Sequence, residues 1–214
     1  MHPDTIDPSI RNNPRAQTVR LVSRGSKVLE VGCASGYMSE YLQRELGCDV
    51  TGVERDSEAA ELARRKGIRV IVGDIEQDST QQMITGQYDC ALFTDVLEHL
   101  RNPSGVLAAL SRRLTTGGTV ISSIPNVAHW SVRWRLLVGR FDYSDGGLLD
   151  QDHIRFFTRK TAIETFHRAG FRVECLRIVH SFPRFLRLPD RLQEAFAQMA
   201  PGLLAYQFII VARK

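Results

Sequence analysis

The chain has 214 residues, of which 43% are hydrophobic and 24% charged, and these values predict one globular domain with a substantial core. No run of about 18 apolar residues occurs and the chain begins with polar residues, so we expect neither a transmembrane helix nor a secretory signal, and a cytoplasmic location. The net charge of +4 is a modest basic bias, which by itself does not indicate a nucleic-acid-binding protein.

Strands and helices are predicted to alternate along the chain, which favours a parallel sheet. An N-terminal arm, residues 1–24, contains a short predicted helix at 16–22, and a single domain, residues 25–214, follows it. The predicted strands cover residues 27–31, 49–54, 69–72, 88–93, 118–124, 171–179 and 206–211. The predicted helices cover residues 37–46, 57–66, 103–114 and 159–169.

The first strand runs into a glycine turn that opens a helix. Gly32 and Gly36 allow a sharp turn with close backbone approach, which delivers a ligand to a helix N-terminus. A dinucleotide site would need three glycines in the G-x-G-x-x-G pattern, but Ala34 and Tyr37 stand at the second and third positions. Glu30, just before the turn, would repel a pyrophosphate and attract an ammonium group.

This segment resembles the nucleotide-binding motif of class I S-adenosylmethionine-dependent methyltransferases, acid-x-Gly-x-Gly-x-Gly, with Ala34 at the middle glycine. The resemblance implies S-adenosyl-L-methionine as cofactor and S-adenosyl-L-homocysteine as product. It also implies a Rossmann-like, doubly wound, seven-stranded and mainly parallel α/β sheet with an antiparallel last strand and a lid insert. The residues that it assigns to the cofactor in this segment are Glu30, Gly32, Cys33, Gly36 and Tyr37.

Three later strands also end in acidic residues. Glu54, 18 residues after Gly36, is spaced to bind both ribose hydroxyls, and Arg55 follows it. Asp74 and Ile75 match the family positions that contact adenine. The fourth strand ends at Asp95 and the string Asp-Val-Leu-Glu-His-Leu, which is familiar from small-molecule members of the family.

Each acid alone could have a structural role instead. An acid after a strand is often a helix N-cap, although Asp56 or Ser57 could cap the next helix without Glu54. Four motifs in order, each at the carboxyl end of a strand, together favour a binding site for S-adenosylmethionine.

Residues 126–157 are much longer than the usual connection of about two to six residues and form a candidate substrate-side insert. Its first half contains Trp130, Trp134, Leu137 and Val138 at helical spacing, which predicts a lid helix. We expect the two tryptophans to pack this helix on the sheet rather than to stack on a substrate.

The second half carries the string Leu-Asp-x-x-His-Ile-Arg-Phe-Phe-Thr, which resembles a signature of bacterial methyltransferases associated with glycans and small metabolites. Asp150 could fix the tautomer of His153, the first candidate for a catalytic base. His129 is the second candidate and His99 the third. Alternatively, Asp150, His153 and Arg155 only pin the insert to the sheet through hydrogen bonds.

These observations predict a methyltransferase that acts on a small molecule or a sugar/glycan, and they favour oxygen as the methylated atom. The alternatives are a methyltransferase of RNA or another macromolecule, a nucleic-acid-binding protein, and a catalytically silent cofactor-binding subunit. The motif of base-amine methylases, Asn/Asp-Pro-Pro-aromatic, is replaced by Ile-Pro-Asn-Val at 124–127, which disfavours a nucleic-acid substrate.

The remaining expectations concern partners and metals. An arginine-rich rim on the substrate side would suit an acidic acceptor; it comprises Arg133, Arg135, Arg140, Arg155, Arg159, Arg177, Arg184, Arg187 and Arg191. We expect no insertion into a membrane, and a homodimer stays open. No metal ion is expected, although Asp95, Asp150 and Asp152 offer oxygen ligands for magnesium. The four cysteines show no paired or metal-type spacing.

Overall fold

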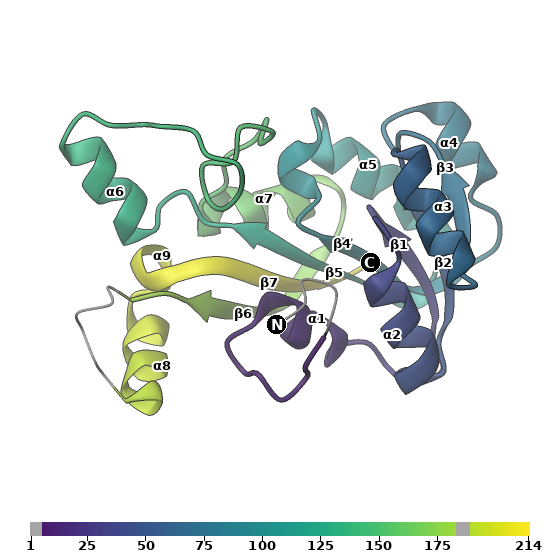
Figure 1. Ribbon diagram of the computed structural model, residues 1–214, viewed down its shortest axis with the longest axis horizontal. Helices are drawn as coiled ribbons and strands as arrows, with labels where there is room; N and C mark the ends of the chain where they lie inside the picture. The colour runs from purple at the N-terminus through teal and green to yellow at the C-terminus, as the bar shows by residue number, and fades with distance from the viewer. Residues whose placement is uncertain (1–5, 183–188) are drawn as a thin grey trace.

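The computed structural model describes residues 6–182 and 189–214, and these form an α/β fold around a seven-stranded sheet (Figure 1). The strands are β1 (Lys27–Val31), β2 (Asp49–Glu54), β3 (Arg69–Val72), β4 (Tyr88–Thr94), β5 (Leu114–Pro125), β6 (Arg172–His180) and β7 (Ala205–Arg213). The helices are α1 (Pro14–Val19), α2 (Tyr37–Leu46), α3 (Ser57–Arg65), α4 (Asp78–Met83), α5 (Pro103–Leu110), α6 (Trp130–Leu137), α7 (Arg159–Arg168), α8 (Asp190–Met199) and α9 (Pro201–Leu204).

The strand order is β3-β2-β1-β4-β5-β7-β6. The strands from β1 to β5 pair in parallel, whereas β7 lies antiparallel between β5 and β6. This arrangement confirms the predicted Rossmann-like sheet with its antiparallel last strand. The chain reverses its direction of travel across the sheet between β1 and β4, and such a reversal opens a crevice at the carboxyl ends of the strands.

Alternate residues of β1 face two helical layers. Val28 packs with Leu42 of α2 on one face, where α1 also lies. Leu29 and Val31 belong to the core on the opposite face, which includes Phe166 of α7. Figure 1 shows α1 and α2 below the sheet and α5 and α7 above it. Within the described ranges, no helix combines the length and the apolar character needed to cross a bilayer.

The N-terminal helix differs from its prediction at both ends. It begins at Pro14, because the Asn13 side chain accepts a hydrogen bond from the Ala16 N–H and proline suits the first helical position. It ends at Val19, whose side chain is buried with residues of α2 and β1. The described part of the predicted arm therefore joins the core of the domain.

Other differences concern the bounds of predicted elements and three further helices. The predicted helix 103–114 ends at Leu110, a 3₁₀ turn follows (Ser111–Arg113), and β5 begins earlier than expected. The sequence did not predict α4, α8 or α9. Two of these have four to six residues, too few to show a period. The sequence of α8 does carry large apolar residues at helical spacing, Leu192, Phe196 and Met199, and this signal was missed.

Gly36 and Gly47 cap the two ends of α2 with nearly equal φ, 75° and 68°, and form a matched pair for mutation. A Cβ at Gly36 would lie 2.8 Å from the Cβ of Ala63 in α3, whereas a Cβ at Gly47 would meet no atom within 4 Å. We expect Gly47→Ala to lower the free energy of unfolding by about 1 kcal/mol, through backbone strain alone. Gly36→Ala should lower it by about 2 to 4 kcal/mol, because the clash adds to the strain. Urea unfolding measures both, and equal losses would contradict a requirement for close packing of the turn on α3.

Candidate functional site

A cavity of about 240 Å³ opens at the carboxyl ends of β1, β2, β3 and β4. Its walls come from the residues that end these strands and from the turns that follow them. Six of the predicted cofactor residues line it: Gly32, Glu54, Arg55, Asp74, Ile75 and Asp95. The structure thus gathers, at one edge of the sheet, side chains that are far apart in the sequence.

Glu54 connects the end of β2 to the glycine turn after β1. Its Oε2 accepts a hydrogen bond from the Ala34 N–H at 2.8 Å, and its Oε1 accepts one from the Asp56 N–H at 2.9 Å. Ala34 has a φ of 46°, a left-handed conformation that costs a residue with a Cβ about 1 to 2 kcal/mol. Each carboxylate oxygen has a second lone pair, so Glu54 can brace the turn and still accept hydrogen bonds from a ligand.

Asp95 is held by strands on the far side of the cavity. Its Oδ1 accepts hydrogen bonds from Ser123 Oγ in β5 at 2.7 Å and from Gln207 Nε2 in β7 at 2.8 Å. Its φ of 54° is left-handed, and burial raises the pKa of its carboxyl. Asp74, after β3, accepts a hydrogen bond from the Glu76 N–H at 2.9 Å, which fixes its carboxylate in the turn.

Glu76 is a cavity residue that the sequence analysis missed. Its carboxylate accepts hydrogen bonds from the N–H groups of Arg101 and Asn102, at 3.1 and 2.7 Å, and so ties the turn after β3 to the start of α5. The available signal was a second acid two residues after Asp74.

The other predicted cofactor residues do not line the cavity and support the turn instead. Cys33 is buried, and a Cβ at Gly52 would lie 2.5 Å from its Sγ. Gly36 caps α2, and the Tyr37 ring lies 4.7 Å from the guanidinium carbon of Arg15 in α1.

Glu30 lies on the face of β1 opposite Leu29 and Val31, and its carboxylate accepts a hydrogen bond from Ser39 Oγ in α2. The side chain is 3% exposed, and burial raises its pKa to about 7. The sequence pattern predicted the acid and its spacing but not the orientation of its side chain. Because the Glu30 carboxylate faces α2, the geometry disfavours the predicted contact with the ammonium group of the cofactor.

This burial predicts a pH dependence of stability. Between about pH 4.5, the usual pKa of glutamate, and about pH 7, the folded chain keeps the Glu30 proton that the unfolded chain loses. The contribution of Glu30 to the free energy of unfolding therefore falls as the pH rises through this range, by about 3 kcal/mol in total. Glu30→Gln removes this pH-dependent contribution. The free energy of unfolding of the variant, relative to that of the original protein, should therefore rise by about 3 kcal/mol from pH 4.5 to pH 8. Urea unfolding at the two pH values tests this, and parallel stability curves would contradict it.

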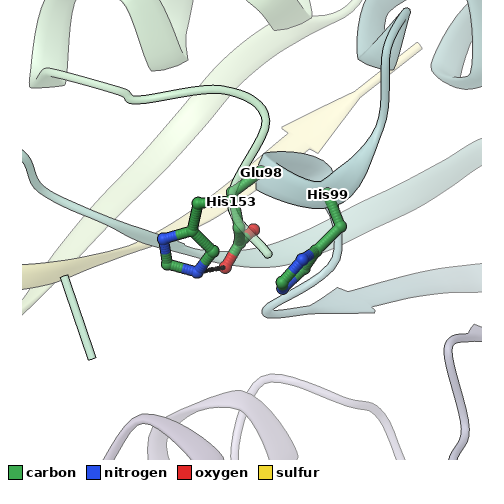
Figure 2. A group of neighbouring side chains, drawn as sticks. All are labelled: Glu98, His99 and His153. Carbon is green, nitrogen blue, oxygen red and sulfur yellow. Dashed lines mark ion pairs between the residues drawn. The ribbon is translucent and has the colours of Figure 1, made fainter. Parts of the chain in front are cut away.

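A second group of polar side chains, Glu98, His99 and His153, lies beside the cavity (Figure 2). Glu98 and His99 come from a 3₁₀ turn after β4 (Leu97–His99), and His99 lines the cavity. Glu98 Oε1 lies 3.9 Å from His153 Nε2, and the two imidazole rings meet edge to face with centroids 4.9 Å apart. Glu98 is 1% exposed and burial raises its pKa well above the usual value.

The backbone of the insert is anchored at this group. The N–H groups of Ile154 and Arg155 both donate to the Glu98 carbonyl oxygen at 2.9 Å. The carboxylate of Asp150 accepts a hydrogen bond from the Asp152 N–H. Burial lowers the pKa of His153, and the nearby charge of Asp150 partly offsets this, so the two side chains lie close enough to interact, without the hydrogen bond that the sequence suggested. The string pins the insert to the sheet and also brings His153 next to His99.

His129 is a correction to the predicted catalytic residues. Its side chain is 1% exposed and caps α6, with Nδ1 2.8 Å from Ser131 Oγ and Nε2 3.1 Å from the Ser181 carbonyl oxygen. Both ring nitrogens are engaged and the residue does not line the cavity, so its role is structural. Trp134 is a second correction, because it is 62% exposed where core packing was expected, and Val132 is the buried residue of α6.

Part of the predicted arginine rim is used within the chain. Arg133 Nε donates to the Ala128 carbonyl oxygen at 2.7 Å, and Arg140 pairs with Asp142 at 2.9 Å. Arg155 donates to the Arg101 carbonyl oxygen. Arg184 and Arg187 lie outside the described residues.

The sequence profile of a family described as "methyltransferase domain" matches residues 10–176. The chain belongs to this family. The match spans the strands from β1 to β5 and the cavity at their ends. It confirms the resemblance to class I S-adenosylmethionine-dependent methyltransferases, and with it S-adenosylmethionine as the cofactor of the family.

Solved structures of low sequence identity share the fold of this methyltransferase domain. An S-adenosylmethionine-dependent methyltransferase from Archaeoglobus fulgidus superposes with a TM-score of 0.68 at 17% identity, over 94% of this chain and 92% of that one. Magnesium protoporphyrin IX methyltransferase from Synechocystis, with bound S-adenosylhomocysteine, gives a TM-score of 0.60 at 17% identity, over 89% and 75% of the two chains.

Sequence relatives match over a shorter stretch. The ubiquinone biosynthesis O-methyltransferase of Erwinia tasmaniensis is 34% identical over 109 residues, which is 48% of this chain and 43% of that protein. The protein of the same name from Xanthomonas oryzae pv. oryzae is 33% identical over 113 residues, 51% and 47% of the two chains. The matched part of the methyltransferase domain therefore spans about half the length of these relatives.

Proposed function

We propose that this chain transfers the methyl group of S-adenosylmethionine to an oxygen atom of a small-molecule acceptor. The observation that carries the proposal is the cavity at the carboxyl ends of β1 to β4, where Glu54, Asp74 and Asp95 converge in a chain of the methyltransferase family. The relatives named ubiquinone biosynthesis O-methyltransferases support both a small acceptor and oxygen as the methylated atom.

In this proposal the cavity holds the adenosine part of the cofactor. Glu54 accepts hydrogen bonds from the ribose hydroxyls, while Asp74 and Ile75 contact the adenine ring, and Arg55 closes the edge next to Glu54. Position 32 requires glycine, because a Cβ there would lie 2.7 Å from Val96 Cγ2 on the cavity wall. The absence of a side chain leaves the backbone of this turn open to the cofactor.

The remaining cofactor contacts are shared between the turn and the end of β4. Asp95 faces the methionine part of the cofactor, since it lines the cavity on the side of β4. The backbone between Cys33 and Tyr37 contributes the helix N-terminus, and Glu30 supports the turn from the α2 side.

Methyl transfer asks the protein mainly for positioning. The acceptor oxygen forms a bond to the methyl carbon while the carbon–sulfur bond breaks and leaves the neutral thioether, S-adenosylhomocysteine. Correct alignment of the two reactants contributes up to about 7 to 11 kcal/mol. A hydroxyl acceptor must also lose its proton. We assign this step to His99 and His153, whose rings meet at the edge of the cavity.

The insert, residues 126–157, is the proposed acceptor-binding part of the domain. It exposes several large apolar side chains, namely Trp134, Leu136, Leu137, Val138, Phe141, Tyr143 and Ile154. Apolar side chains gathered on a surface segment are typical of binding sites, so an acceptor with an apolar part suits the insert. A glycan or acidic acceptor has fewer free groups to meet it, since Arg133, Arg140 and Arg155 are engaged within the chain.

Calorimetric titration with S-adenosylhomocysteine tests cofactor binding directly. We expect saturable binding of one molecule per chain, and the absence of heat at micromolar protein would contradict the proposal. Retention of RNA with a steep dependence on salt would instead favour a nucleic-acid substrate. Normal cofactor binding without transfer to any acceptor would favour a silent subunit.

A further inference from the structure

We propose that Glu98, His99 and His153 form a binding site for one divalent first-row transition-metal cation. Each residue offers one ligand atom, and the three atoms lie within 4.8 Å of one another. Ligand atoms on one ion, with bonds of about 2.1 Å, lie up to roughly 4 Å apart. Small side-chain rotations therefore suffice to bring the three atoms onto a common ion.

The carboxylate of Glu98 is buried and both of its oxygens are available to a ligand. It is 1% exposed, and neither Oε1 nor Oε2 has a hydrogen-bond partner among the residues that the structure describes. A buried carboxylate without partners is strongly unfavourable, so such groups in proteins are neutralised by a proton, paired with a cation or bound to a metal ion. Figure 2 shows this carboxylate directed toward the His153 ring, with which it makes its one drawn contact, at 3.9 Å.

Each imidazole presents one ring nitrogen to the proposed ion. His99 Nδ1 lies 2.9 Å from the Asp152 carbonyl oxygen, and because a carbonyl only accepts, Nδ1 carries the hydrogen and Nε2 keeps its lone pair. A backbone carbonyl behind an imidazole is the usual outer support of a histidine ligand, since it fixes the tautomer and the ring orientation. In His153, Nε2 is the ring nitrogen that faces Glu98, 3.9 Å from Oε1.

The ligand types select the class of cation. Two imidazoles and one carboxylate suit first-row transition metals, whereas magnesium and calcium prefer oxygen ligands. The site is also distinct from the aspartates that the sequence suggested for magnesium, because Asp150 is bound to the Asp152 backbone and Asp95 to Ser123 and Gln207.

Three protein ligands leave coordination positions for water or substrate. His99 also lines the cavity, so these positions would face the acceptor side of it. Resting on the proposed function, the ion would bind a hydroxyl oxygen of the acceptor and lower the pKa of that hydroxyl.

The test is a titration of the chelator-treated full chain with Co²⁺, followed by visible absorption, and with Mn²⁺, followed by electron paramagnetic resonance. We expect one bound ion per chain. Glu98→Gln, which keeps the side-chain shape, and His153→Ala should each weaken binding by at least about 100-fold, because loss of an outer support alone costs about 10 to 100-fold. His167→Ala, on the exposed end of α7, is the matched control and should leave the affinity unchanged. Circular dichroism and S-adenosylhomocysteine binding report whether each variant is folded.

Three results would overturn the proposal: no saturable binding of either ion, equal affinity in the original chain and in folded Glu98→Gln, or saturation by Mg²⁺ alone. Metal binding is measured without the cofactor and without an acceptor. Its failure is therefore distinguishable from a failure of the methyl-transfer proposal, which the S-adenosylhomocysteine titration tests.

Discussion

Glu54→Gln is expected to weaken binding of S-adenosylhomocysteine by about 100-fold or more. Two charge-assisted hydrogen bonds to the ribose hydroxyls, each contributing about 1.5 to 3 kcal/mol, would be lost or weakened. The same carboxylate accepts the N–H groups of Ala34 and Asp56, so a neutral amide also loosens the turn that carries the rest of the cofactor. Isothermal titration calorimetry measures the effect.

Glu58→Gln is the matched control for this prediction. Glu58 is four residues away, in the first turn of α3, and is exposed, so the same substitution there should leave the affinity within about twofold. Thermal unfolding of both variants shows whether a loss of affinity reflects a loss of structure. Equal affinity of Glu54→Gln and Glu58→Gln would remove Glu54 from the cofactor site.

His153→Gln is expected to slow methyl transfer by about 100-fold while leaving the affinity for S-adenosylhomocysteine nearly unchanged. His153 does not line the adenosine cavity but touches His99, which does. Its Nε2 lone pair serves the acceptor side, either by taking a proton or by holding a cation, and the glutamine amide nitrogen has no such lone pair. The measurement is the turnover of labelled S-adenosylmethionine with an extract of small metabolites.

His167→Gln on α7 controls for a general effect of removing an imidazole and should retain full turnover. If His153→Gln also retains it, the anchoring alternative is correct: the contacts of Ile154 and Arg155 with Glu98 then account for this segment of the insert. A rise in the acceptor KM with unchanged kcat would likewise indicate a role in shaping the insert rather than in the transfer step.

The sheet was predictable because its signals are local. Each of β1 to β4 is a short apolar run that ends in or just before an acid or a glycine. Because parallel strands meet at one edge, the positions of Glu54, Asp74 and Asp95 followed from their order alone. The antiparallel β7 could not come from periodicity, and it was expected only through the family resemblance.

The orientation of single side chains was harder to predict. Glu30 and Leu29 are neighbours in the sequence but face opposite sides of β1, so the acid meets Ser39 instead of the cavity. The sequence ranked His153 ahead of His129 as a candidate base but kept both, and the contacts of His129 with Ser131 and Ser181 are what exclude it. Such contacts join segments far apart in the chain, and the sequence does not encode them in any short motif.

The sequence also did not predict that three residues, Glu98, His99 and His153, would lie together. The first two residues stand in a motif that was recognised, but the third comes from the insert more than 50 residues later. Nothing in the spacing links the two segments. The link is made by the Glu98 carbonyl, which accepts the N–H groups of Ile154 and Arg155.

The most direct test of the proposed activity is to incubate the protein with S-adenosylmethionine carrying a ¹³C-labelled methyl group and an extract of low-mass metabolites. The products are followed by mass spectrometry and by the carbon chemical shift of the label, which separates methyl groups on oxygen from those on nitrogen. We predict a labelled small molecule with the methyl group on oxygen, formed together with S-adenosylhomocysteine and absent without the protein. Label that stays in S-adenosylmethionine, or that moves only to RNA or protein added to the reaction, would contradict this account.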